Sequence, residues 1–109
     1  MIIDFNKIEE SVIENFKGGE GATNVRMFFD GTNRIMLGTL KSGSSIGMHT
    51  HDTSSEILYI LEGSGKTVTN GVTERLEKGM CTYCEKGSTH TLINDGDKEL
   101  RFFAVVPQQ

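Results

Sequence analysis

Three histidines and one glutamate are the residues of this chain whose types and spacing could bind a metal ion. The histidines are His49, His51 and His90, and Glu56 lies five residues after His51. In a strand, side chains two residues apart point to the same face, about 7 Å apart along it, so His49 and His51 could bind one ion together. Glu56 and His90 would come from two further strands. If all of these strands face one interior, three imidazoles and a carboxylate converge there.

An H-x-H pair alone is common by chance, and a single histidine is more often structural or exposed. The surrounding sequence pattern is therefore needed to distinguish a metal site from a chance pair. The first pattern, G-x5-H-x-H-x4-E-x6-G, is matched at every fixed position by Gly43, His49, His51, Glu56 and Gly63. The second, G-x5-P-x-G-x2-H-x3-N, is matched by Gly79, Gly87, His90 and Asn94, with Glu85 in place of the usual proline. The two patterns resemble the two motifs of the cupin superfamily, and the short spacer between them is typical of compact bacterial cupins.

The resemblance implies both a fold and a set of ligands. It implies that His49, His51, Glu56 and His90 are the metal ligands. It also implies an all-β fold, a single jelly-roll β-barrel, with residues 1–109 forming one cupin domain and a core over about 24–106. The glycine-rich segment 18–21 and the residues after it resemble small bacterial cupins labelled oxalate-decarboxylase-like or sugar-isomerase-like. Such labels rest mostly on fold, which does not determine function.

Short apolar runs separated by turn residues independently predict an all-β fold. The predicted strands are 24–29, 33–39, 45–50, 55–62, 65–70, 72–77, 80–84, 89–94 and 99–106. Asn70-Gly71 is the clearest hairpin turn, because both residues tolerate positive φ. Nine short, closely spaced strands favour a sandwich or barrel over a parallel α/β sheet.

The N-terminal segment allows two interpretations. Ile8, Val12 and Phe16 recur every four residues, which predicts a short helix over 6–16. An extra strand followed by a loop fits the same residues. The glycine-rich residues 17–23 predict a flexible connection to the first strand of the barrel.

Three imidazoles and one carboxylate form a mixed nitrogen and oxygen site for one divalent transition-metal ion. Mn, Fe, Co, Ni, Cu and Zn all fit such ligands, and the sequence does not choose among them. Four protein ligands on an octahedral ion leave two positions for water or a substrate, where the ion could act as a Lewis acid. From strand parity and apolar character we expect the pocket to be lined by Phe28, Met36, Leu58, Ile60, Tyr83, Leu92 and Phe103.

The net charge and composition restrict the classes of partner that we expect this protein to bind. The net charge is -4 and the isoelectric point is about 5.3, which argues against nucleic acid and anionic membranes as partners. No signal peptide or membrane-spanning run is evident, so we expect a cytoplasmic protein. Cys81 and Cys84 are expected to be free thiols, because in a strand they would point to opposite faces.

Two strands are apolar at consecutive positions. Residues 57–61 (Ile-Leu-Tyr-Ile-Leu) and 102–106 (Phe-Phe-Ala-Val-Val) have no polar face, which is typical of strands covered on both sides. A small barrel has only one interior. We therefore expect the outer face to be covered by the second subunit of a homodimer.

The leading functional hypothesis is a metal-dependent enzyme acting on a small polar metabolite, either a sugar, a sugar acid or a carboxylate. A non-catalytic module that binds a small ligand or a metal is the alternative, because no second general base is evident. A structural barrel with a vestigial site ranks lowest, since all four ligand positions are intact. Arg26, Arg34 and Arg101 are candidates for binding an anionic substrate, although such arginines are more often solvated surface residues.

Overall fold

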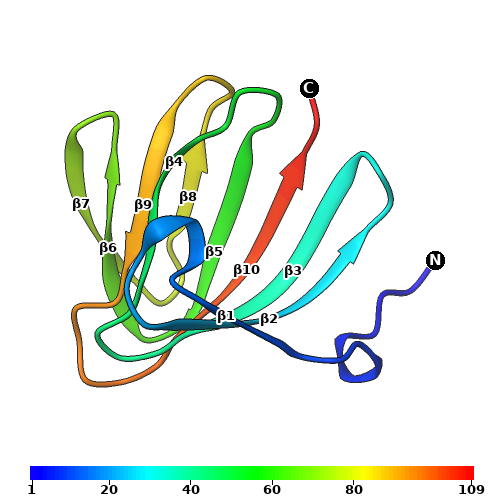
Figure 1. Ribbon diagram of the computed structural model, residues 1–109, viewed down its shortest axis with the longest axis horizontal. Helices are drawn as coiled ribbons and strands as arrows, with labels where there is room; N and C mark the ends of the chain where they lie inside the picture. Colours follow the sequence, from blue (N-terminus) through cyan, green and yellow to red (C-terminus); the bar gives the residue numbers. More distant parts are fainter.

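Two antiparallel sheets make up nearly all of the computed structural model, which describes residues 1–109 (Figure 1). Six strands form the first sheet in the order β1-β2-β3-β10-β5-β8, and four form the second in the order β4-β9-β6-β7. The strands are β1 Ser11–Glu14, β2 Ala22–Phe29, β3 Asn33–Leu40, β4 Ser45–Thr50, β5 Glu56–Glu62, β6 Ser64–Thr69, β7 Val72–Glu77, β8 Cys81–Cys84, β9 Thr89–Ile93 and β10 Leu100–Pro107. From β3 onward the chain passes repeatedly between the two sheets, which is the jelly-roll arrangement that was expected.

The strand predictions are confirmed. All nine strands expected from the sequence are present, with bounds that differ by no more than two residues. The turn between β6 and β7 is Asn70-Gly71, with φ values of 49° and 83°. Positive φ at both positions matches the twist of a two-residue hairpin, which explains why this pair was a reliable signal.

The interior between the sheets is apolar because one face of each strand points inward. In β10, Leu100, Phe102, Ala104 and Val106 are buried, whereas the residues between them are half-buried or exposed. Both sheets contribute to one core of eleven buried residues: Met36, Leu40, Ile46, Leu58, Ile60, Leu76, Leu92, Leu100, Phe102, Ala104 and Val106. These residues pack the space between the two sheets.

The N-terminal helix prediction is wrong, and the alternative of an extra strand is correct. The segment contains a 3-10 turn η1 (Phe5–Lys7), the strand β1 and a second 3-10 turn η2 (Phe16–Gly18). β1 pairs with β2 in an antiparallel register, so the sheet satisfies its backbone groups. Phe16 packs against the core, but Val12 is 60% exposed, so the spacing of apolar residues did not mark one buried helical face.

A β-bulge in β4 sets the direction of the first two histidines. Ile46 pairs with Leu92 and His49 pairs with His90, so three residue steps on β4 oppose two on β9. The extra residue shifts the inward-facing phase of the strand by one position. Ile46 and His49 consequently both face the interior, although a regular strand would send them to opposite faces.

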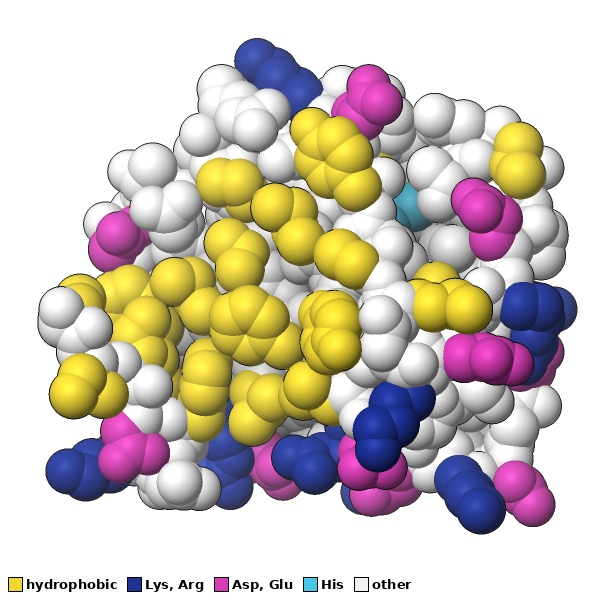
Figure 2. Space-filling model, turned by 180° about the vertical axis from the view of Figure 1, so that it is seen from behind, with side chains coloured by type: hydrophobic (Ala, Val, Ile, Leu, Met, Phe, Trp, Pro, Cys, Tyr) yellow, Lys and Arg dark blue, Asp and Glu magenta, His cyan; other side chains and the backbone are white.

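The outer face of the six-stranded sheet is strongly apolar (Figure 2). Ile57 and Tyr59 of β5 are 43% and 42% exposed, and Tyr83 of β8 is 60% exposed. The half-buried residues Ile35, Leu37, Phe103 and Val105 lie on the same face. Within one chain, therefore, only the inner face of residues 57–61 is covered. No helix has the length and apolar character needed to span a membrane.

Candidate metal centre

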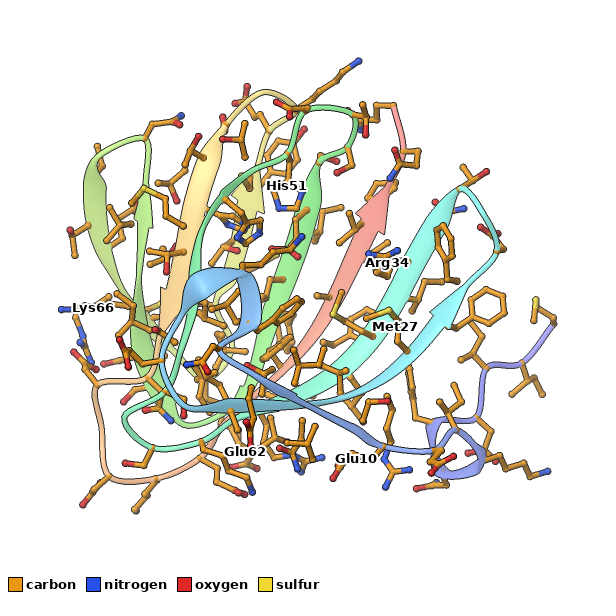
Figure 3. The ribbon with its side chains drawn as sticks, in the orientation of Figure 1. Glu10, Met27, Arg34, His51, Glu62 and Lys66 are labelled. Carbon is orange, nitrogen blue, oxygen red and sulfur yellow. The ribbon has the colours of Figure 1, made fainter.

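Four side chains from three strands converge at one end of the space between the sheets. His49 belongs to β4 and His51 follows this strand, Glu56 begins β5, and His90 lies in β9 opposite His49. The six-stranded sheet supplies the carboxylate, the four-stranded sheet supplies the imidazoles of His49 and His90, and His51 comes from the segment directly after β4. Figure 3 shows His51 toward the uppermost end of the sheets in that view. We refer to His49, His51, Glu56 and His90 as the His–Glu cluster.

The ligand atoms of the His–Glu cluster lie close together. Nε2 of His90 is 2.9 Å from Nε2 of His51 and 2.9 Å from Oε1 of Glu56, and Nε2 of His51 is 3.9 Å from the same oxygen. One ligand atom from each of the four residues lies within 4.8 Å of every other. The three imidazole rings meet edge to face, with centroids 4.7 to 4.9 Å apart. Each ring therefore presents an edge toward a common point.

Contacts of the Nδ1 atoms orient the imidazole rings of His49 and His51. Nδ1 of His49 lies 2.7 Å from the carbonyl oxygen of Gly47, and Nδ1 of His51 lies 3.0 Å from Oγ of Ser54. A carbonyl oxygen only accepts, so Nδ1 of His49 carries the proton and donates it. His51 can donate to Ser54 in the same way. Nε2 of each neutral ring is then free to bind an ion, as expected for histidines whose other nitrogen is held by the protein.

Burial keeps two of these histidines neutral. It lowers the pKa of His49, with the Gly47 carbonyl acting in the opposite direction, and it lowers the pKa of His51, where Glu56 opposes it. A lowered pKa favours the neutral imidazole, which is the form that binds metal. Both rings are therefore ready to bind a cation at neutral pH.

The residues present fit a divalent metal ion. Two ligands about 2.1 Å from an ion and at right angles to each other are about 3 Å apart, which matches the 2.9 Å separations of the cluster. The set consists of three imidazoles and one carboxylate and contains no thiolate. His49, His51, Glu56 and His90 could therefore hold a metal ion, and their chemistry suits first-row transition metals.

A cavity of about 340 Å³ opens beside the His–Glu cluster. Its walls include three residues expected from the sequence, Met36, Leu58 and Leu92, together with Ile46, Phe102 and Val106, which were not expected. Lys17, Arg34 and Asp52 are its other charged residues outside the cluster. The cavity therefore combines an apolar wall with a polar end that could bind a ligand.

Four residues expected to line the pocket lie elsewhere, and this corrects the parity argument. Ile60 does face inward, but it is fully buried in the core away from the cavity. Phe103 and Tyr83 lie on the outer face of the six-stranded sheet, where Phe103 pairs with Tyr59 and Tyr83 with Ile57. Phe28 borders a surface hollow beside the N-terminal segment. Their apolar character was not evidence of which face they occupied.

Other residues at the site had no signal in the sequence. The segment 16–19 joins the end of the predicted helix to the connection expected to be flexible. It packs against β4 and brings Phe16 and Lys17 to the cavity. Gly19 is buried there, with no room for a side chain beside Ser45 and Gly47. Ser54 lies in the turn between His51 and Glu56, and only the folded turn reveals its contact with His51.

The two cysteines are free thiols, as expected. Cys81 is exposed, whereas Cys84 is buried and pairs in register with Glu56. Burial raises the pKa of the Cys84 thiol, and the negative charge of Glu56 acts in the same direction. The thiol is therefore held protonated, and no thiolate competes with the imidazoles for an ion.

Comparison with known proteins gives a consistent family. A family model described as a cupin domain matches residues 36–106, which include the whole His–Glu cluster. A protein named oxalate-binding protein, from Thermotoga maritima, is 30% identical over 112 residues, which cover 97% of this chain and 93% of that protein.

Solved structures support the same fold. The crystal structure of a predicted oxalate decarboxylase from Thermotoga maritima superimposes with a TM-score of 0.92 at 29% identity, over 100% of both chains. A polyketide cyclase from Streptomyces resistomycificus gives a TM-score of 0.80 at 21% identity, over 98% of this chain and 78% of that chain. The second likeness concerns the fold alone, because the identity is low.

Proposed function

The chain belongs to the cupin family, and on this premise we propose that its His–Glu cluster binds one divalent transition-metal ion that holds a small polar metabolite. The observation that carries the proposal is the convergence of three imidazoles and a carboxylate at the polar end of a cavity. Mn, Fe, Co, Ni, Cu and Zn are the candidate ions. When bound, such an ion would supply Lewis-acid chemistry by polarising an oxygen atom of its ligand.

The protein's own residues have distinct roles in this proposal. Glu56 provides the one negative charge of the cluster, and Gly47 and Ser54 orient the rings of His49 and His51. The apolar wall excludes water from the bound metabolite, which strengthens electrostatic interactions within the cavity.

The ligand class that fits is a small molecule with two neighbouring oxygen atoms. A sugar, a sugar acid or a short carboxylate has this property and fits a cavity of about 340 Å³. The relative named oxalate-binding protein supports this class, because oxalate presents two such oxygens.

We propose an enzyme rather than a binding module, although one observation favours the alternative. Outside the His–Glu cluster, Lys17, Arg34 and Asp52 are the charged residues of the cavity, and both Lys17 and Asp52 are exposed. A buried general acid or base beyond the cluster is therefore absent. A non-catalytic module would need only the ion and the walls of the cavity.

Calorimetry on metal-free and metal-loaded protein tests the proposed binding, with oxalate as the probe. We expect oxalate to bind only the loaded form, and binding of equal strength to both forms would contradict the proposal. Incubation of the loaded protein with a panel of sugars, sugar acids and carboxylates, followed by NMR, separates the two functions. Conversion of one compound that stops in Glu56→Gln would favour the enzyme, whereas binding without conversion would favour the module.

We also propose that the apolar outer face of the six-stranded sheet packs against a second copy of the chain. Charged side chains lie at the margins of this face in Figure 2, so two copies would meet without like-charge repulsion. The adjoining N-terminal residues Met1 and Ile2 are 97% and 90% exposed and would add apolar area. Monomers seldom expose apolar patches larger than a few hundred Å². Two-fold symmetric dimers are the commonest assembly, so an identical partner is the simplest occupant.

A further inference from the structure

Arg34 is a half-buried cation that faces the same cavity as the His–Glu cluster. It lies at the start of β3, on the same face as Met36 and Leu40, which are both buried in the core. It lines the cavity, and its Nε atom is buried without a hydrogen-bond partner. It forms no salt bridge with any carboxylate of the chain. Buried donors are nearly always paired in folded proteins, so this one points to a partner that the chain does not supply.

The position of the guanidinium is fixed by the protein. Its central carbon lies 4.7 Å from the centre of the Phe29 ring, and Phe29 pairs directly with Arg34 across the β2–β3 hairpin. Stacking on an aromatic ring restrains a guanidinium while leaving its N–H groups available at the edge. Arg34 is therefore held in place before any ligand binds.

The strand register places Arg34 level with Glu56 on the other side of β10. Val105 of β10 pairs with Ile35 on one side and with Ile57 on the other. The next row therefore contains Arg34, Val106 and Glu56, all facing the interior. Adjacent strands are about 4.8 Å apart, so the backbones of Arg34 and Glu56 are roughly 10 Å apart. Both side chains project from this sheet into the interior, so a ligand that joins them must span about this distance. An acid of roughly four or five carbons covers it, together with its contacts to the ion and to the guanidinium.

The surface between these two ends is apolar. Val106 separates them in the row, and Met36, Leu58 and Phe102 form the neighbouring wall of the cavity. Outside the His–Glu cluster the cavity has two cationic side chains, Lys17 and Arg34, and one anionic side chain, Asp52. A divalent ion on the cluster would make the cavity more positive still. A ligand with one chelating end, a short hydrocarbon middle and an anionic far end matches this arrangement.

We propose that Arg34 binds the second carboxylate of a short dicarboxylic acid whose other end chelates the ion. This inference rests on the proposed function and narrows its ligand class from polar metabolites in general to acids with two separated anionic groups. Arg34 is a specificity-determining residue in this account. Oxalate is too short to reach both ends, so longer acids should bind more tightly.

Malate and lactate are matched probes for this subsite. Both have an α-hydroxycarboxylate that can chelate an ion, and only malate has a second carboxylate. Calorimetry on protein loaded with Mn²⁺ should give tighter binding of malate than of lactate, by on the order of tenfold to a hundredfold, because a charge-assisted hydrogen bond is added. Equal affinities would overturn the proposal.

Two variants and a control assign the difference to Arg34. Arg34→Gln should lose the preference for malate while keeping its metal content and its affinity for lactate, and Arg34→Lys should keep part of the preference. Arg101→Gln removes a positive charge from an exposed arginine on β10 and should behave like the parent. If Arg34→Gln still preferred malate, the role assigned to Arg34 would be wrong, whereas the proposed function would stand. Failure of the parent to bind Mn²⁺ and lactate would instead contradict the proposed function.

Discussion

Nδ1 of His51 lies 3.0 Å from Oγ of Ser54, three residues further along the chain. The contact links a ring of the His–Glu cluster to the turn that leads into β5, where Glu56 is the first residue. Two ligands on different sheets are thus positioned by one short turn. Within the five residues that lead from His51 to Glu56, the side chain of Ser54 faces back toward the ring.

The Ser54–His51 contact predicts that Ser54→Ala weakens metal binding. Loss of the hydrogen bond frees the ring to rotate, and removal of such a contact typically lowers metal affinity by about 10- to 100-fold. A competition titration with a fluorescent chelator measures the change. Ser64→Ala, at an exposed serine in β6, is the control and should bind like the parent. Equal affinity in Ser54→Ala would show that the contact does not orient the ligand.

The packing of segment 16–19 on β4 predicts a large effect of Gly47→Ala. A Cβ atom at Gly47 would lie 2.1 Å from the carbonyl oxygen of Lys17 and 2.7 Å from the amide nitrogen of Gly19, so the segment must move. We expect the free energy of unfolding to fall by about 1–3 kcal/mol, measured by urea denaturation. Metal affinity should also fall, because the Gly47 carbonyl orients His49.

Gly96→Ala is the matched control for Gly47→Ala. The nearest atom to a Cβ at Gly96 is 3.6 Å away, at ordinary van der Waals distance. Its stability and metal affinity should stay close to those of the parent. If Gly47→Ala were equally harmless, the close packing of segment 16–19 against β4 would not hold in solution.

Metal removal should lower the thermal stability of the protein. The cluster joins both sheets, and a ligand at 100 times its dissociation constant stabilises the folded state by about 2.7 kcal/mol. For a chain of this size, that corresponds to a decrease in Tm of about 10 °C or more after chelator treatment. Differential scanning calorimetry measures the change, and readdition of the ion should restore it. A parent whose Tm is the same with and without chelator would argue against an ion at this site.

The outer apolar face predicts a dimer in solution that Tyr59→Lys disrupts. Light scattering should give the parent a mass of twice 12.0 kDa, and the variant should be a monomer because a buried lysine charge opposes association. Val72→Lys, at an exposed residue of β7 on the other sheet, is the control and should remain dimeric. A parent mass of 12.0 kDa at micromolar concentration would contradict the proposed dimer.

Much of the fold and of the metal centre could be predicted because their signals are local. Turn pairs such as Asn70-Gly71 define strand ends, and the spacing of His49, His51 and Glu56 places these ligands in and around two consecutive strands of the chain, β4 and β5. To predict the cavity walls, one must know which residues of each strand face inward. In strands with apolar residues on both faces, the sequence does not give this information. Phe103 and Tyr83 were therefore placed inside when they lie outside.

Other features depend on contacts between distant parts of the chain. The bulge between Ile46 and His49 arises from pairing with β9 and has no signal within β4. β1 replaces the expected helix because pairing with β2 satisfies its backbone. Arg34 was one of three candidate arginines, and only the folded register places it in the cavity.

Metal content is the most direct test of the His–Glu cluster. Elemental analysis of the parent and of His51→Ala should be made in parallel, on protein purified without chelator and without added metal. We predict close to one transition-metal ion per chain in the parent and its loss in the variant. Equal metal content in the two proteins, or none in the parent even after reloading, would contradict the account.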